Sequence, residues 1–326
     1  MPAMSIVRPS EPVPDVLVFG EALVDVFDRE SVLGGAPFNV ARHLAGFGLA
    51  PWLISRVGKD GNADLIRDEM SRWGMSSAAL QTDGLRATGM VTVHIDGPDR
   101  HRFEIASDAA WDHIDEAALP LALPAVVSTS WLYYGTLGLR ARPSRRAWQR
   151  LYGVHRGKRY LDLNWRAGHV DQTVAWQAFA LADVVKLNSE ELAMLLDWNR
   201  LSSRWTTAPA PCGQVCPGIA QLLAPNKLGQ LIVTYGSDGY AAYDRFGHCE
   251  SAGPALQGTA VIDTVGAGDA FSAVVLAGLV WDWNSGLALR RASEFAAAIC
   301  GVRGAVPQDS DFYKRWCERW QLAHSI

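Results

Sequence analysis

Short apolar runs rich in β-branched residues alternate with amphipathic stretches along most of this chain, which limits its possible folds more than any other feature. The runs that we predict to be buried strands lie at 16–19, 52–54, 131–133, 159–161, 184–187 and 231–234. Helical periodicity follows the first two of them, at 39–47 and 62–73. Because buried parallel strands need helices to cover their sheet, the sequence predicts an α/β fold.

Two segments interrupt this alternation. Gly89 to Ile105 has a strand, turn and strand pattern, which is typical of a β-hairpin. Because a hairpin adds little core to a parallel fold, we expect it to project as a lid over a site or to pair with a partner chain. Phe27 and its neighbours would join it in a small sheet. Asn199 to Pro217 is rich in Pro, Ser and Thr and is predicted to be a surface excursion and the loop of this chain that is disordered.

Charge and hydropathy narrow the classes of function. The 326 residues include 34 acidic and 30 basic ones, a formal charge of −4. This balance is not that of a general nucleic-acid binder, so we expect a small-molecule partner and no nucleic acid.

The longest apolar stretch, 270–281, is shorter than the roughly 20 residues of a membrane span. The first ten residues lack a secretory signal's apolar centre, so we expect no membrane association and a cytoplasmic location.

The cysteines do not form a recognisable framework. Five of them are scattered along the chain, an odd number that argues against paired disulfides and for a reducing compartment. Cys212 and Cys216 are separated by three residues in a loop with Pro and Gly, and no second Cys or His pair accompanies them. We therefore interpret them as loop thiols rather than zinc ligands.

The run Asp263-Thr264-Val265-Gly266-Ala267-Gly268-Asp269 leads into an apolar helical stretch. Its glycines let the backbone turn tightly at a helix start, where unpaired N–H groups and the helix dipole attract an anion. A carboxylate at position 269 would repel that anion unless it had a task such as accepting a proton from an attacking hydroxyl. The alternative is that Asp269 caps an ordinary helix. The run alone leaves both interpretations open.

Other phosphate-binding loops do not match. The pair Gly58-Lys59 has Leu53 where a Walker A loop requires glycine, and Asp60 follows it. The glycines at 266 and 268 are followed by Phe271 where a dinucleotide fingerprint requires Gly or Ala. The sequence therefore favours neither a P-loop nor a dinucleotide site.

Two blocks together resemble the signatures of the PfkB (ribokinase-like) carbohydrate kinases. One is Gly34-Gly35-Ala36-Pro37-Phe38-Asn39-Val40-Ala41 and the other is the run 263–269, and the resemblance extends from about Val16 to Pro307. It implies a ribokinase-like three-layer α/β/α fold with a mostly parallel central sheet and a small β lid. It also implies one kinase domain at 15–321, between an N-terminal tail of 1–14 and a C-terminal tail of 322–326.

Within that family, residues 20–25, 34–39 and 162–166 are most similar to fructokinases. The resemblance implies ATP-dependent phosphorylation of a sugar's primary hydroxyl, with fructose as the preferred acceptor and fructose 6-phosphate as the product. Asp269 would be the general base, in a catalytic loop with Gly266, Ala267 and Gly268. A 2-keto-3-deoxygluconate kinase, a ribokinase or nucleoside kinase, and a non-catalytic sugar or nucleotide sensor on the same fold remain alternatives.

The resemblance also assigns the sugar site. Asp25, Gly34, Gly35 and Asn39 would bind the sugar, and a carboxylate and an amide suit hydroxyl groups that both donate and accept. The alternatives are a plain turn at the two glycines and a helix N-cap at Asn39.

Arg166 and Trp165 are the last two sugar-site candidates. Arg166 resembles a basic residue at the distal end of the sugar or on the phosphate path, where it would neutralise developing charge. Its alternative is an ion pair with Asp162. Trp165 lies between matched residues and is the best aromatic candidate for sugar contact, although aromatic residues more often fill cores.

The remaining assignments concern the nucleotide, ions and partners. By resemblance, the nucleotide-binding residues are Asn188, Thr234, Gly236, Gly239, Thr264, Gly266 and Gly268. Asn188 and Glu191 would hold Mg²⁺ through water; the alternative, compatible with it, is a helix capping box. A K⁺ site is implied at Asp263, Val265, Arg303 and Gly304. The expected partners are a sugar, ATP and a second copy of the chain, joined through the lid.

Overall fold

The computed structural model describes residues 13–27, 30–95, 101–119, 129, 131–201, 208–255 and 261–322, and the side chains of 27, 30, 93–95 and 101–103 are not among them. The strands of its larger sheet are β1 (Val16–Phe19), β4 (Pro51–Val57), β5 (Leu80–Thr82), β8 (Trp131–Gly135), β9 (Lys158–Asp162), β10 (Val184–Asn188), β11 (Gln230–Thr234), β12 (Tyr240–Asp244) and β13 (Cys249–Gly253). Their order is β13-β12-β11-β10-β9-β8-β1-β4-β5.

This sheet is parallel from β5 to β11, and β12 and β13 extend it in antiparallel pairs. Successive side chains of a strand point to opposite faces. In β1, Leu17 and Phe19 accordingly enter one hydrophobic cluster, and Val16 and Val18 enter the other. The predicted α/β fold with a mostly parallel sheet is confirmed.

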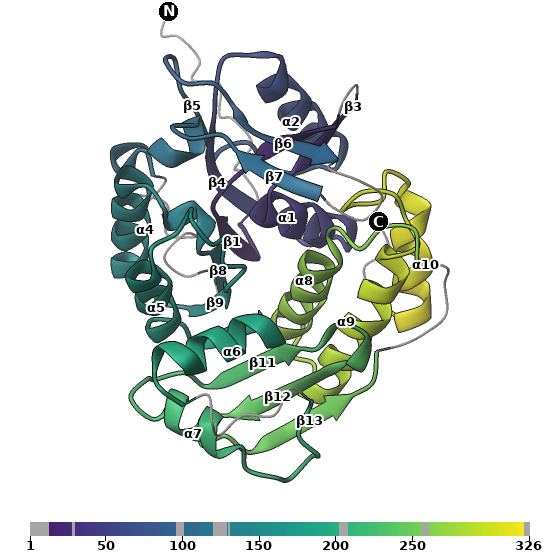
Figure 1. Cartoon of the computed structure of the whole chain (residues 1–326). Coiled ribbons are helices and arrows are strands. Elements are labelled where there is room, and N and C mark those ends of the chain that lie inside the picture. The colour runs from purple at the N-terminus through teal and green to yellow at the C-terminus, as the bar shows by residue number, and fades with distance from the viewer. Residues whose placement is uncertain are drawn as a thin grey trace, which may run out of the picture.

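Helices cover both faces of the sheet (Figure 1). One face packs against α4 (Arg142–Val154), α5 (Gln172–Ala180), α6 (Ser189–Trp198) and α7 (Pro217–Leu223). The other packs against α1 (Ala36–Gly46), α2 (Gly61–Arg72), α8 (Ala267–Val280), α9 (Ser285–Ile299) and α10 (Ser310–Trp320). Short 3₁₀ turns lie at η1 (Ala110–His113), η2 (Glu116–Ala118), η3 (Leu137–Leu139) and η5 (Gly236–Asp238). These are the three layers that the resemblance implied.

A smaller sheet lies beside α1 at the top of Figure 1. Its strands are β2 (Leu23–Phe27), β3 (Glu30–Gly34), β6 (Gly89–Ile95) and β7 (His101–Ile105), in the order β3-β2-β6-β7. The antiparallel pairing of β6 with β7 confirms the predicted hairpin. The parallel pairing of β2 with β6 confirms the small sheet expected with Phe27. The predicted turn at 96–99 lies outside the described residues.

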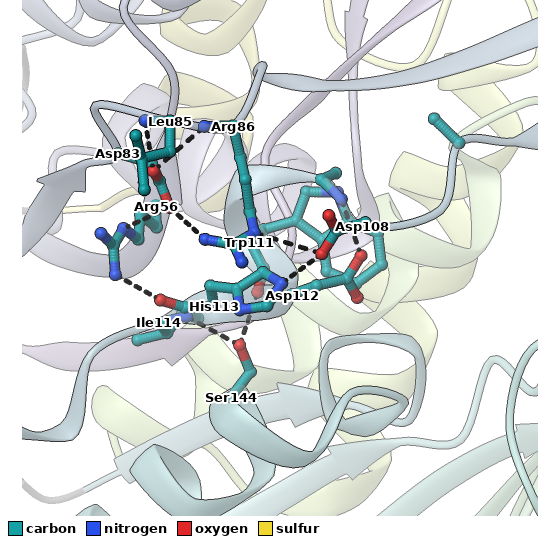
Figure 2. Close-up of polar contacts among 12 residues, drawn as sticks. Arg56, Asp83, Leu85, Arg86, Asp108, Trp111, Asp112, His113, Ile114 and Ser144 are labelled. Carbon is teal, nitrogen blue, oxygen red and sulfur yellow. Dashed lines mark hydrogen bonds and ion pairs between the residues drawn. The ribbon is translucent and has the colours of Figure 1, made fainter.

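Polar contacts fasten the chain where it returns from this sheet to the body (Figure 2). Arg86 pairs with Asp108, which also contacts the His113 ring. Arg56 donates to the His113 carbonyl at 2.6 Å and pairs with Asp83. The base of the smaller sheet is therefore fixed to the body through charged side chains.

The segment from Asn199 to Pro217 is more ordered than predicted. Residues 202–207 lie outside the described part, but Ala210 is buried and its N–H donates to the Tyr243 hydroxyl at 3.4 Å. Val215 forms a bridge with His248. The predicted surface location is confirmed for residues 211–215, which are exposed, and the contacts of Ala210 and Val215 connect this irregular stretch to β12 and to the turn before β13.

Two findings concern the sequence-based exclusions. Each cysteine is a free thiol. In the part of the chain that the structure describes, we find no helix with the length and apolar character of a membrane span.

Candidate active site

The predicted site residues gather at the carboxyl ends of the parallel strands, where α/β folds bind their ligands. Asp162 ends β9 and Asn188 ends β10, in register with Thr234 at the end of β11. Glu21 follows the last residue of β1 by two positions. The smaller sheet contributes Asp25 from β2.

Asp269 lies in the first turn of α8, and the N-cap of this helix is Gly266. Gly266 has a φ of +80°, and a Cβ there would lie 2.5 Å from Ala305 Cα, so only glycine fits. The N–H of Ala267 donates to the Thr264 carbonyl at 3.3 Å, whereas the next two N–H groups, of Gly268 and Asp269, have no intrahelical acceptor and are donors beside the carboxylate. Asp269 Oδ2 accepts a hydrogen bond from Asn39 Nδ2 at 2.8 Å. Asp269 is therefore not the cap of this helix.

Asn39 is likewise not an N-cap, because α1 begins after Gly35 and Asn39 lies inside its first turns. Its side chain is buried, and its Oδ1 has no hydrogen-bond partner among the described residues. A buried acceptor without a donor costs stability unless a ligand or water supplies one. The helix-cap alternative for Asn39 is thus wrong, and its free oxygen fits a ligand hydroxyl.

Three carboxyl groups of the site are unusually basic. Burial raises the pKa of Asp269 to about 6, and the Asn39 hydrogen bond and the charges of Lys186 and Arg166 oppose this rise. Burial and the negative charge of Asp269 raise the pKa of Asp25 to about 6. Burial raises the pKa of Glu21 to about 7. A carboxyl with a pKa near 6 is a stronger base than an exposed one and is still mostly ionised at pH 7.

The two glycines before α1 make room for these carboxyls. A Cβ on Gly34 would lie 2.3 Å from Asp25 Oδ2. Gly35 has a φ of +98°, and a Cβ there would lie 2.7 Å from the Glu21 carbonyl oxygen. The pair is more than a plain turn, because it brings the backbone against two acidic residues.

A buried polar network supports the start of α8 from below. Lys186 Nζ contacts both carboxylate oxygens of Asp162, at 3.1 and 3.2 Å, and Ser272 Oγ donates to Asp162 Oδ2 at 2.7 Å. A Cβ on Gly268 would lie 3.1 Å from Lys186 Nζ. A buried ion pair of Lys186 with Asp162 thus lies beneath the first turn of α8.

The Asp162 contacts overturn the ion pair considered for Arg166. Asp162 bonds to Lys186 and Ser272, and Arg166 is exposed and pairs with no acid in the described ranges. Its positive charge lowers the pKa values of Glu21, Asp25 and Asp269. Arg166 is thus an exposed cation whose charge favours the ionised forms of the carboxyl cluster.

Trp165 is partly buried and packs against the edge of the hydrophobic core. Its indole N–H donates to the Val170 carbonyl at 3.0 Å, and its ring meets Trp198 edge-on at 5.3 Å between centroids. Sugar contact by Trp165 stays a prediction.

The capping box expected at the start of α6 is confirmed. Asn188 Oδ1 accepts from the Glu191 N–H at 2.8 Å, and Glu191 Oε2 accepts from the Asn188 N–H at 2.9 Å. The other oxygen of Glu191 accepts from the Trp165 N–H at 2.7 Å. All three side-chain oxygens of Asn188 and Glu191 therefore already accept a hydrogen bond from the protein. Each of them keeps a further lone pair for water, so the two residues fit a metal that is held through water.

The predicted nucleotide loop is a tight turn after β11. The Tyr235 N–H donates to the Gly239 carbonyl at 2.8 Å. Gly236 and Gly239 have φ values of +59° and +100°, and a Cβ on Gly239 would lie 2.0 Å from the Gly253 carbonyl oxygen. Thr234 lies next to Asn188 across the strands, which brings the two predicted nucleotide residues together.

The predicted K⁺ residues surround one loop. Asp263 accepts from the N–H groups of Val265, at 2.9 Å, and Gly304, at 3.1 Å. The N–H groups of Ile262 and Asp263 donate to the Cys300 carbonyl at 2.8 and 3.1 Å. The side chain of Asp263 thus connects the segment 262–265, which includes Thr264, to the segment 300–304, which includes Arg303.

Sequence reasoning missed Glu21 and Lys186. Both lie inside motifs that the resemblance used, yet neither was assigned a role. The available signal was the type of residue, because a charged side chain beside a buried strand is rarely buried without a partner or a function.

Comparison with known proteins places this geometry in context. The model of the pfkB family of carbohydrate kinases matches residues 5–311. A fructokinase of Klebsiella pneumoniae is 31% identical over 277 residues, which span 81% of this chain and 84% of that protein.

Solved structures show the same fold. The fructokinase of Xylella fastidiosa with bound ATP superposes with a TM-score of 0.78 at 22% identity, over 94% of this chain and 99% of that one. The fructokinase of Vibrio cholerae in its fructose, ADP and calcium ion bound form has a TM-score of 0.69 at 24% identity, over 90% and 94% of the two chains. The predicted ribokinase-like fold is confirmed.

Proposed function

Since the chain belongs to the pfkB family of carbohydrate kinases, we propose that it transfers the γ-phosphoryl group of ATP to a primary hydroxyl of fructose and releases fructose 6-phosphate. The acceptor hydroxyl oxygen forms the new bond to phosphorus as the bond to the ADP oxygen breaks. The hydroxyl proton passes to Asp269.

The observation that carries this proposal is the position of Asp269 at the start of α8. Its carboxylate is held by Asn39 at 2.8 Å beside the N–H groups of Gly268 and Asp269, which have no intrahelical acceptor. Those donors favour the negative charge of a transferring phosphoryl group. The pKa of about 6 keeps Asp269 ionised at neutral pH and able to take a proton.

The proposed acceptor rests on the neighbouring side chains and on the relatives. Asp25, the free Oδ1 of Asn39 and the exposed Arg166 offer two acceptors and one donor group around Asp269, a set that fits a neutral polyhydroxyl ligand. The Klebsiella pneumoniae relative is a fructokinase, and the Vibrio cholerae structure contains fructose. The same Arg166 would suit a sugar acid, which keeps 2-keto-3-deoxygluconate as the second acceptor to test.

ATP requires a divalent cation, for which we propose Mg²⁺. Asn188 and Glu191 are the residues that would hold it through water, and the ion would neutralise charge on the phosphates. For K⁺, the carbonyl-rich loop around Asp263 and Gly304 is the proposed site. Thr234, Gly236 and Gly239 would lie against the nucleotide.

The smaller sheet is the proposed lid. Gly34 and Gly89 join it to the body, and its strand β2 carries Asp25, so its closure would bring that carboxylate to the sugar and exclude water. We further propose that the lids of two copies pair, because β3 and β7 are edge strands of this sheet. Sedimentation of the purified chain at several concentrations tests the dimer.

A sugar panel tests the function. ATP consumption with Mg²⁺ would be measured with fructose, 2-keto-3-deoxygluconate, ribose and glucose, and the phosphorylated product identified. We expect kcat/KM for fructose to lead by tenfold or more, which is about 1.4 kcal/mol. A lead by another sugar would replace the acceptor and keep the kinase. Binding of sugar without turnover would support a sensor.

A further inference from the structure

A buried histidine on α1 lies one helical turn after Asn39. His43 is four residues further along the helix than Asn39, so the two side chains lie on the same face. Asn39 bonds to Asp269, and His43 Nε2 lies 3.2 Å from the carbonyl oxygen of Ala305. His43 is fully buried, and the proposed reaction makes no use of it. One face of α1 thus contacts both the proposed base and the segment that follows α9.

Ala305 packs directly against the residue that begins α8. A Cβ on Gly266, the N-cap of this helix, would lie 2.5 Å from Ala305 Cα and 2.8 Å from its carbonyl oxygen. The carbonyl group that contacts His43 therefore also lies against the turn that is the proposed phosphoryl site. Because protein interiors are close-packed and transmit strain, a shift of Ala305 moves Gly266 and the N–H groups that follow it.

The hydrogen bonds of His43 fix the proton on one ring nitrogen. A carbonyl oxygen can only accept, so Nε2 carries the proton and donates it to Ala305. Nδ1 is then an acceptor, and the Tyr313 hydroxyl donates to it at 2.9 Å. Burial and the charge of Arg42 lower the pKa of His43 to about 3, so the ring is neutral at pH 7. Tyr313 thus favours the tautomer in which His43 can donate to Ala305.

Tyr313 is fixed in turn by the packing around it. It lies in α10 and is fully buried. A Cβ on Gly46, the last residue of α1, would lie 2.5 Å from Cε1 of its ring, so glycine lets the ring lie against the helix. Phe47 meets the same ring edge-on at 5.4 Å between centroids. The hydroxyl therefore has a defined position, and His43 connects α10 to the start of α8.

Other contacts hold the neighbours of Ala305. The Gly304 N–H donates to Asp263 Oδ2 at 3.1 Å, and Arg42 donates to the Pro307 carbonyl at 2.9 Å. These bonds hold the segment before and after Ala305, and they remain when His43 is replaced. The His43 bond acts on the residue that touches Gly266 itself. Its loss should therefore displace the start of α8 without releasing the segment.

We propose that His43, in the tautomer favoured by Tyr313, is a positioning residue that holds Ala305 against Gly266 and so aligns the first N–H groups of α8 with the transferring phosphoryl group. This inference rests on the proposed function, in which that group lies at the start of α8. A misplacement of about 1 Å costs on the order of 10²-fold in rate when a group must be aligned with the reacting atoms. The loss should appear in kcat and not in KM for the sugar, because these donors act on the phosphoryl group in the transition state.

Substitutions of His43 test the proposal at saturating K⁺, Mg²⁺ and ATP. His43→Leu removes both hydrogen bonds, whereas the amide N–H of His43→Gln can still donate to Ala305. The matched control is His155→Leu, because His155 is also buried and its Nε2 bonds to the Thr129 carbonyl at 2.9 Å. His155 precedes β9 and so lies at the edge of the sheet opposite the site.

We expect His43→Leu to lower kcat with fructose by tenfold or more and to keep KM for fructose within twofold of the wild type. His43→Gln should lose less than threefold in kcat, and His155→Leu less than twofold. An equal fall in His43→Leu and His155→Leu, or in the two His43 variants, would overturn the proposal. Should His43→Leu fail to fold, Tyr313→Phe is assayed instead, because it removes only the hydroxyl that favours the tautomer; an unchanged kcat would then overturn the proposal.

Two measurements do not depend on activity. Nitrogen-15 spectra of the wild type should show His43 as the neutral Nε2–H tautomer from about pH 5 to about pH 8, and an Nδ1–H tautomer would overturn the proposal. The Ala270 N–H donates to the Gly266 carbonyl at 2.8 Å, so its hydrogen exchange should be faster in His43→Leu than in the wild type or in His155→Leu. Unchanged exchange would refute the positioning role even in an active kinase. If the wild type phosphorylates no sugar, the proposed function fails, and the exchange at Ala270 still shows whether His43 holds the start of α8.

Discussion

Replacing Asp269 by asparagine should inactivate the protein and at the same time stabilise it. The carboxylate is the proposed general base, so turnover should fall by about 10²-fold or more. Stability should change in the opposite direction, because burial raises the pKa of Asp269 from the ordinary 3.8 to about 6. The folded state therefore holds the ionised form at a cost that asparagine, a neutral residue of the same shape, does not incur.

The magnitude follows from the pKa. A difference of about two units at 1.36 kcal/mol each sets an upper limit of about 3 kcal/mol, and solvent screening at this half-buried side chain lowers the expectation to about 1–2 kcal/mol. The sign depends on pH. The cost of ionisation is fully present above about pH 6 and disappears as the pH falls towards 4, so the gain of the variant should shrink over that range.

Urea denaturation at pH 7.5 and at lower pH, together with ATP consumption, measures both effects. Asp282→Asn is the matched control, because this exposed residue follows the other end of α8 and the substitution removes the same charge. Turnover of Asp269→Asn close to that of the wild type would refute the base. A variant destabilised at pH 7.5, or equally stabilised at every pH, would refute the electrostatic reasoning.

Three further predictions follow from the same site. Asn39→Ala removes the hydrogen bond that favours ionised Asp269, so the acid limb of the kcat profile, expected near pH 6, should move up by about one unit; an unmoved limb contradicts this. Glu21 has a pKa of about 7 against an ordinary 4.5, so the wild-type free energy of unfolding should fall as the pH rises from 4.5 to 7, by up to about 1.36 kcal/mol per pH unit. Urea unfolding of Glu21→Gln at several pH values should show a weaker dependence of that free energy on pH, and an equal dependence would contradict this. Gly35→Ala, which puts a Cβ 2.7 Å from the Glu21 carbonyl oxygen at a φ of +98°, should cost about 1–3 kcal/mol; urea unfolding at the wild-type midpoint would show that the turn tolerates a side chain.

Local sequence patterns predicted most of the fold and part of the candidate site. The composition of apolar β-branched runs predicted six of the seven parallel strands described in the larger sheet, all but β5, and the alternation at Gly89 to Ile105 predicted the hairpin. Asn188 and Glu191 were predicted as a capping box because the motif is a contact between residues three apart. Such features depend on neighbours in the chain, so the sequence contains the information directly.

Contacts between distant residues could be seen only in the tertiary structure. Asn39 and Asp269 are 230 residues apart, and their hydrogen bond replaced two separate helix-cap interpretations. An ion pair of Asp162 with Arg166 was the alternative interpretation of the sequence, but β10 lies next to β9 and brings the buried Lys186 to Asp162 instead.

The basicity of Glu21 has the same origin. It arises from burial among elements that the sequence does not order in space. The sequence thus determined which residues are chemically able to act, because residue type and local pattern are written in it. The packing of strands and helices decided which of them meet, because burial and charge proximity depend on segments far apart in the chain.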